Sequence, residues 1–153
     1  MPVNSELVGR EFPPTAPYLV GREKVREFAR AVFADAPQHT DVSAARAAGF
    51  ADVVAPPTFA MVVQDHTLQQ LLAEPDSGIV LARTIHAEQR FTYSRPIVAG
   101  DELTAQLKVT GIRMMAGNAL ITSDAEITDA EGSHVVTATS VLLVGSDEEG
   151  EGQ

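Results

Sequence analysis

The stretch Pro56–Ala73, PPTFAMVVQDHTLQQLLA, decides the fold that this chain can adopt. Its prolines suit the start of a helix, because proline costs little where no intrahelical N–H bond is made. The apolar residues that follow spread round more than one face of the helix expected over 57–73: Phe59, Ala60, Met61, Val62, Val63, Leu68, Leu71 and Leu72. A helix that is apolar on several faces predicts burial by other structure on more than one side.

Upstream of this helix, apolar spacing predicts two further helices. The first is expected over 23–34 and ends before Pro37, because five apolar residues recur at helical spacing: Val25, Phe28, Ala29, Val32 and Phe33. The second is short, over 43–48, with Ser43 or Asp41 as its N-cap. The chain is therefore helical before the long helix and changes character after it.

Downstream, the hydrophobic period becomes two, which is typical of half-buried strands. Four strands joined as an antiparallel meander are expected over 78–95, 102–114, 118–128 and 134–144, with Tyr18–Gly21 as an edge strand. Together these elements predict an α+β fold in which a curled antiparallel sheet wraps round the long helix. The alternative is a sheet with that helix lying flat on one face.

Length and composition restrict the function. The 153 residues suit one domain, expected over 1–144, followed by an acidic tail over 145–153 that is expected to be disordered. The absence of cysteine excludes a disulfide framework and a thiolate nucleophile. A net charge of -10 argues against nucleic acid as a partner. No apolar run approaches the ~20 residues that cross a bilayer, and the N-terminus lacks a signal-peptide layout, so no membrane association and a cytoplasmic location are expected.

Among the four histidines, only His39 lies in a loop dense with acids, between Asp35 and Asp41. An imidazole beside a carboxylate can move a proton near neutral pH. The alternative is a solvated turn, in which both aspartates cap helix ends. The usual nucleophile and phosphate-binding motifs are missing, and the possible metal ligands never repeat at the spacing that a site needs, so no metal and no cofactor are expected.

Four blocks of the sequence closely resemble the MaoC-like hot-dog dehydratases of actinobacteria: Arg22–Ala29, Pro37–Asp41, Ala45–Phe59 and Arg95–Leu103. The resemblance extends over about residues 8–144. It implies a hot-dog fold. It further implies (R)-specific hydration or dehydration between enoyl and 3-hydroxyacyl thioesters in fatty-acid metabolism, with acyl carrier protein or coenzyme A as the carrier.

The match to the active members of that family is partial. Their catalytic loop reads Asp-x-Asn-Pro-x-His, and alignment on Pro37 and His39 leaves Ala34 in place of the Asp and Ala36 in place of the Asn. Their oxyanion glycine falls on Pro57, which has no N–H to donate. The chain therefore resembles most the non-catalytic subunit of heterodimeric (3R)-hydroxyacyl-ACP dehydratases.

This resemblance implies a chain that helps to bind the acyl thioester beside a paralogous MaoC-like catalytic subunit. A single chain would leave unpaired strand edges and an open acyl channel, so a homodimer is expected in isolation. The residues expected to bind substrate are Pro57, Thr58, Phe59, Met61 and Val62. His39 is expected near the mouth of the dimer-interface channel without an aligned carboxylate. The alternatives are a self-sufficient homodimeric hydratase that uses His39 with Asp35, a non-enzymatic acyl-binding module, and a thioesterase, which the lack of a carboxylate on the long helix before Asp65 disfavours.

Overall fold

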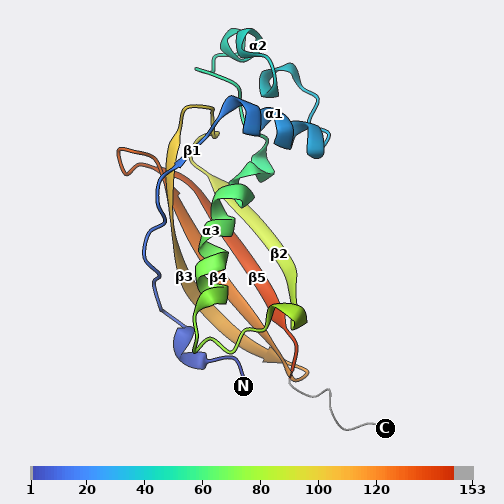
Figure 1. Cartoon of the computed structure of the whole chain (residues 1–153), viewed down its shortest axis with the longest axis vertical. Helices are drawn as coiled ribbons and strands as arrows, with labels where there is room; N and C mark the ends of the chain where they lie inside the picture. Colours follow the sequence, from blue (N-terminus) through green and yellow to red (C-terminus); the bar gives the residue numbers. More distant parts are fainter. Residues whose placement is uncertain (1, 147–153) are drawn as a thin grey trace.

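The computed structural model describes residues 2–146, and these form one antiparallel sheet curled round a long helix (Figure 1). The helices are α1 (Arg22–Ala31), α2 (Val42–Ala47) and α3 (Ala60–Ala73), and α1 and α2 lie together beyond one end of the sheet. The strands are β1 (Tyr18–Leu19), β2 (Thr84–Tyr93), β3 (Glu102–Met115), β4 (Asn118–Thr128) and β5 (His134–Val144). The expected α+β hot-dog arrangement is confirmed.

Helix α3 begins directly after a 3-10 turn over Pro57–Phe59. Pro56 is the N-cap of this turn and Pro57 is its first residue, so both prolines precede the α-helix. Its sheet-facing side is buried: Ala60, Val63, Gln64, Thr67, Leu68 and Leu71. The N-terminal segment covers part of the rest, since Leu7 and Phe12 are buried in the same core. A stripe with Asp65, His66 and Gln69 stays exposed, so the helix is enclosed on most but not all of its surface.

The strand order is β1-β3-β4-β5-β2. Strands β3, β4 and β5 form a meander, but the expectation that β2 continues it next to β3 is wrong, because β2 pairs with β5. The distance from β2 to β3 is three strand spacings, about 14 Å. The eight residues 94–101 reach about 26 Å when extended, so they cross the whole end of the sheet.

Strand β2 also begins six residues later than expected, at Thr84, because a 3-10 turn over Leu81–Arg83 precedes it. At its other end, β2 stops at Tyr93, and the segment 94–101 that crosses the end of the sheet follows directly. Only one side of β2 is paired among the described residues, and the opposite side is an open sheet edge.

Helix α1 ends at Ala31, three residues before the expected end, so that boundary is wrong. The reason is Phe33, which adopts a left-handed φ of 58°. The N–H of Ala34 then bonds to the carbonyl of Ala29 at 2.8 Å, a closure typical of a helix C-terminus. The chain has therefore left the helix well before Pro37.

Two apolar clusters fill the space between α3 and the sheet. The first lies at the end where α3 begins and includes Phe59, Ala60, Val63, Leu103 and Ile127. The second lies toward the other end and includes Leu68, Leu71, Leu107, Ile121 and Leu142. The first cluster supports the region where the functional site lies.

Within residues 2–146, no helix is both long enough and apolar enough to span a membrane. Two residues of the expected acidic tail are held by hydrogen bonds: the Gly145 N–H donates to the carbonyl of Arg83 at 2.8 Å, and the Ser146 N–H donates to Oδ1 of Asn118 at 3.2 Å. The remainder of the expected tail, 147–153, lies outside the described residues.

Candidate functional site

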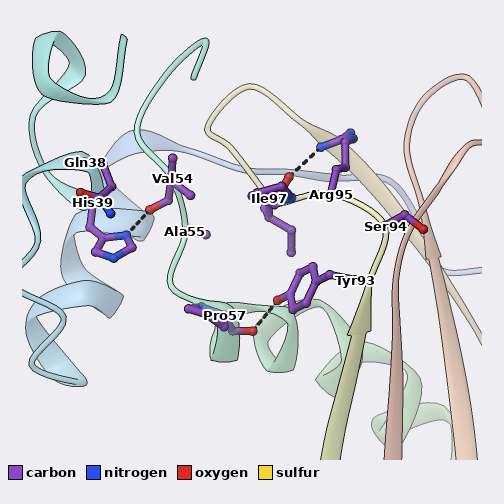
Figure 2. A pocket seen from close by; sticks show the side chains of 10 residues that line it. Gln38, His39, Val54, Ala55, Pro57, Tyr93, Ser94, Arg95 and Ile97 are labelled. Carbon is purple, nitrogen blue, oxygen red and sulfur yellow. Dashed lines mark hydrogen bonds between the residues drawn. The ribbon is translucent and has the colours of Figure 1, made fainter. Parts of the chain in front are cut away.

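A cavity of about 560 Å³ opens beside the start of α3, where three segments distant in sequence converge (Figure 2). Its lining residues are Gln38, His39, Val54, Ala55, Pro57, Tyr93, Ser94, Arg95, Pro96 and Ile97. The volume lies in the range of small-molecule sites, and the wall is mainly apolar with a few polar groups. The site therefore has the size and the chemistry to accept part of an organic ligand.

Backbone hydrogen bonds hold the three segments together. The Ala55 N–H donates to the carbonyl of Ile97 at 2.8 Å, which joins the segment before α3 to the segment that crosses the sheet. On its other side, the Val54 N–H donates to the carbonyl of Gln38 at 2.9 Å. The chain around Val54 is thus the central strip of the cavity wall.

His39 is half-buried, and its Nδ1 lies 2.6 Å from the carbonyl oxygen of Val54 (Figure 2). Because a carbonyl only accepts, Nδ1 carries the proton in this hydrogen bond. In the neutral imidazole, this hydrogen bond leaves the other ring nitrogen, Nε2, as the one that can accept a proton. Within residues 2–146, no carboxylate makes a hydrogen bond or ion pair with His39.

The two aspartates of the same loop do not reach His39. Asp41 caps α2 by accepting hydrogen bonds from the N–H groups of Ser43 at 2.8 Å and Ala44 at 3.3 Å. Of the two N-caps considered for this helix, Asp41 is confirmed. Asp35 is exposed and makes no side-chain hydrogen bond or ion pair with the described part of the chain. The loop brings an imidazole to the cavity without a carboxylate partner.

The 3-10 turn before α3 offers a free backbone donor. Pro57 has no N–H, and the Phe59 N–H is occupied by the carbonyl of Pro56 at 2.9 Å. The Thr58 N–H has no hydrogen-bond partner among residues 2–146. It lies next in sequence to the cavity-lining Pro57 and is the candidate for the donor that proline cannot supply.

Tyr93 fixes the orientation of that donor. Its hydroxyl donates to the carbonyl oxygen of Pro57, as Figure 2 shows. The Pro57 carbonyl and the Thr58 N–H belong to one trans peptide and point in opposite directions, so the Thr58 N–H points away from Tyr93. Burial raises the pKa of Tyr93 to about 12, so its hydroxyl remains a donor at neutral pH.

The residues expected to bind substrate are spread over different surroundings. Pro57 lines the cavity, and Thr58 is exposed beside it. Phe59 is fully buried and packs edge-on against Phe28, with ring centroids 5.3 Å apart. Met61 and Val62 are half-buried against the apolar clusters, as expected for helix residues near the core.

Arg95 shapes the wall from the opposite side. Its guanidinium binds the Asp101 carboxylate at 2.9 and 3.1 Å and lies 3.4 Å from Asp129. The Asp101 carboxylate also accepts from the Val98 N–H at 2.9 Å, which closes the crossing segment into a fixed loop. The hydrogen bonds that Arg95 donates to the Asp101 carboxylate raise the pKa of Arg95 above its ordinary value. The charge of Arg95 is therefore used mainly to build the cavity.

Sequence reasoning did not assign Val54, Tyr93 or Arg95 to the site. Arg95 carried a signal, since it begins one of the blocks that resemble the dehydratase family. Tyr93 ends a strand, and Val54 acts through its backbone, so neither has a recognisable motif. Among residues 2–146, no group of three or more His, Asp or Glu side chains is placed to hold a metal ion.

Comparisons with known proteins agree with this arrangement. A family model described as FAS1-like, dehydratase domain region, matches residues 6–138. A UPF0336 protein from Clavibacter michiganensis subsp. michiganensis is 62% identical over 148 residues, which cover 97% of this chain and 99% of the relative.

Two solved structures resemble the fold closely. The C-terminally truncated HadBC (3R-hydroxyacyl-ACP dehydratase) complex from Mycobacterium tuberculosis superposes with a TM-score of 0.82 and 30% identity, covering 90% of this chain and 96% of that chain. A MaoC-like dehydratase superposes with a TM-score of 0.78 and 38% identity over 92% of this chain and 43% of that longer chain. By fold, sequence and family model, this chain belongs to the MaoC-like hot-dog dehydratase family.

Proposed function

We propose that the chain is a subunit of a (3R)-hydroxyacyl-thioester dehydratase, or (R)-specific enoyl hydratase, that acts on acyl-ACP or acyl-CoA in fatty-acid metabolism. It supports substrate binding, while a paralogous MaoC-like partner carries catalysis. The observation behind the proposal is the cavity beside α3. It contains His39 without a carboxylate partner, and the turn that leads into α3 at this cavity begins with Pro57, which has no N–H.

Hydration of an enoyl thioester adds water across the double bond next to the thioester carbonyl. A base must take a proton from water, and a donor must stabilise the negative charge that develops on the thioester oxygen. An efficient site supplies both groups already oriented. This chain supplies each of them in a weakened form.

The base is weakened because a neutral carbonyl, not a carboxylate, orients His39. The Val54 carbonyl holds the imidazole in one tautomer, with Nε2 free to accept a proton. It does not offset the positive charge that the ring gains on accepting that proton, as a buried carboxylate does. His39 is therefore suited to bind or orient a polar group better than to drive proton transfer.

The donor is weakened because Pro57 has no N–H. Loss of one oxyanion donor costs about 3 kcal/mol of transition-state stabilisation, or roughly a hundredfold in rate. The free Thr58 N–H supplies residual binding to a thioester oxygen, in an orientation that Tyr93 fixes through the Pro57 carbonyl. The two losses together leave the chain a slow catalyst by itself.

The open edge of β2 supports the need for a partner. One side of Thr84–Tyr93 pairs with β5, and the other side presents unpaired backbone groups with the exposed Ile85. Such an edge invites a strand from another chain. The likeness to the HadBC complex supports a paralogous subunit as that partner, with a homodimer forming when the partner is absent.

The test is turnover of crotonyl and longer trans-2-enoyl thioesters by the purified chain alone, and by the chain mixed with a paralogue that carries the Asp-x-Asn-Pro-x-His loop. We expect the chain alone to be slower than the mixture by orders of magnitude. Full-rate turnover by the chain alone supports the self-sufficient hydratase instead. Thioester binding that no paralogue converts into turnover supports the non-enzymatic acyl-binding module.

A further inference from the structure

Phe33, two residues after the end of α1, is 89% exposed, more than any other large apolar side chain in the described part of the chain. Within residues 2–146 it belongs to neither apolar cluster and packs against no other aromatic ring. Its backbone has a left-handed φ of 58°, which is unfavourable for a bulky residue. No buried contact offsets this cost. A residue held in such a conformation is typical of a functional site.

An arginine without a partner lies beside this ring. The Phe33 N–H donates to the carbonyl of Arg30 at 3.3 Å, so the two residues belong to one turn of the chain. Arg30 is exposed, and its guanidinium makes no hydrogen bond or ion pair with the described residues. By contrast, Lys24 on the same helix lies 3.6 Å from Glu27. The end of α1 therefore presents an exposed aromatic ring and an unpaired positive charge.

The charge of the surroundings favours an anion at this end of the protein. Residues 22–46, which span α1, the His39 loop and most of α2, hold five basic and four acidic residues. The rest of the chain holds six basic and 17 acidic residues, so an anion is repelled least near α1. The exposed Asp35 lies beyond Phe33 in the chain, on the side away from Arg30. An anionic group is therefore favoured beside Arg30.

This turn lies within reach of the cavity. Gln38, which lines the cavity, follows Phe33 by five residues, so their Cα atoms are at most about 18 Å apart. A hydrogen bond from Nε of Arg26 to the Thr40 carbonyl at 2.9 Å holds α1 against the same loop. In coenzyme A, about thirteen bonds separate the thioester sulfur from the first phosphate, or ~16 Å when extended, and the adenine lies beyond. A thioester in the cavity can therefore extend its nucleotide to the end of α1.

We propose that Arg30 and Phe33 bind the nucleotide end of coenzyme A, which makes coenzyme A the carrier of the acyl group. This inference rests on the proposed acyl-thioester binding. The guanidinium pairs with a phosphate, and the phenyl ring stacks on the adenine. Stacking gives a reason for an exposed aromatic ring in an unfavourable backbone conformation. An acyl carrier protein also provides a phosphate at the end of the arm, but it provides no adenine.

The test compares butanoyl-CoA with S-butanoylpantetheine, which lacks the nucleotide, in calorimetric binding to the full chain. We expect butanoyl-CoA to bind about tenfold more tightly, with a difference that decreases as salt rises. Phe33→Leu and Arg30→Gln each reduce this ratio by about threefold and leave the affinity for S-butanoylpantetheine unchanged. Phe33→Trp retains the ratio. Because the natural chain has no tryptophan, stacking of the adenine also quenches the fluorescence of this variant.

Two matched controls leave the ratio unchanged. Val32→Ala shortens the exposed neighbour of Phe33 and keeps the ring, and Arg113→Gln removes an exposed arginine from β3. Equal affinity of the wild-type chain for the two butanoyl thioesters overturns this inference alone. Failure of both thioesters to bind overturns the proposed function together with it.

Two further measurements separate coenzyme A from the other occupants of this surface. If Phe33→Leu weakens the binding of butanoyl-ACP as much as that of butanoyl-CoA, the ring does not recognise adenine, and the assignment is wrong. If Phe33→Leu instead weakens association with the catalytic paralogue and leaves the thioester ratio intact, the ring belongs to the subunit interface. That result also overturns the assignment.

Discussion

The hydroxyl of Tyr93, the last residue of β2, donates a hydrogen bond to the carbonyl oxygen of Pro57, the first residue of the turn before α3. This bond connects the sheet edge to the helix start across the cavity. It also determines where the neighbouring Thr58 N–H points, because both groups belong to one peptide. The orientation of the Thr58 N–H therefore depends on this phenol.

Replacing Tyr93 by phenylalanine removes this bond and leaves the Pro57 carbonyl without its partner. We expect the free energy of unfolding to fall by about 1 kcal/mol, measured by urea denaturation. Acyl-thioester affinity falls as well, since the Thr58 donor is no longer held. Unchanged affinity in a folded Tyr93→Phe variant argues against a role of this peptide in binding.

The raised pKa of Tyr93, about 12, predicts a specific alkaline destabilisation. An unfolded chain loses the phenolic proton near pH ~10, whereas the folded protein keeps it until about pH 12. The unfolded state binds fewer protons in this window, so the free energy of unfolding decreases as pH rises through it. Tyr93→Phe flattens this decrease.

The measurement is the phenolate absorbance of the folded protein as a function of pH. The chain has two tyrosines, and burial also raises the pKa of Tyr18. Tyr18→Phe is therefore the control that isolates the Tyr93 signal. Ionisation of both phenols near pH ~10 in the folded protein contradicts the prediction.

His39→Ala tests where proton transfer takes place. In the reconstituted pair, this substitution leaves the turnover rate nearly unchanged, because the partner carries the Asp/His pair. The matched control is alanine at the histidine of the partner's own loop, which reduces the rate by orders of magnitude. A large loss from His39→Ala instead places the chemistry in this chain.

Arg95→Gln tests the loop that forms one side of the cavity. The variant loses the two-point contact with Asp101, so we expect the free energy of unfolding to fall by on the order of 1 kcal/mol and acyl-thioester affinity to fall with it. Arg113→Gln is the control, since Arg113 is exposed on β3 and makes no ion pair within residues 2–146. Equal effects of the two variants count against a special role of Arg95.

Phe33→Gly is expected to stabilise the isolated chain by about 1 kcal/mol, measured by the thermal midpoint. Phe33 has a left-handed φ of 58° and is 89% exposed, so glycine relieves the backbone without the loss of buried contacts. Val32→Gly is the control, because Val32 has an ordinary φ of -103° and gains nothing from glycine. A destabilised Phe33→Gly variant shows that the exposed ring has a packing role.

The elements that the sequence predicted correctly are those with a strong local signal. The multi-sided apolar pattern of Pro57–Ala73 predicted a helix at the centre, and the alternation of Leu103 to Val109 predicted β3. These patterns depend on residues close in the chain. Strand order does not, because the segment 94–101 is long enough to reach several positions and packing of the inner face selects among them.

The site was less predictable for the same physical reason. The proton position on His39 depends on the Val54 carbonyl, fifteen residues away. Every residue type has such a backbone carbonyl, so the sequence gives no signal for this contact. The early end of α1 depends on the left-handed φ of Phe33, and phenylalanine is not a residue type that favours this conformation. Neighbouring residues in a sequence report helical or strand period, but they do not report which backbone groups meet after folding.

The crossing of residues 94–101 over the end of the sheet has a consequence for the order of folding. Tyr93, Arg95 and Ile97 reach the cavity only after β2 has paired with β5 and β3 has taken its place at the far side. Such contacts between distant parts of the chain form slowly and late. We therefore expect partly folded forms of this protein to lack the cavity beside α3, and a ligand that occupies it to stabilise only the completed sheet.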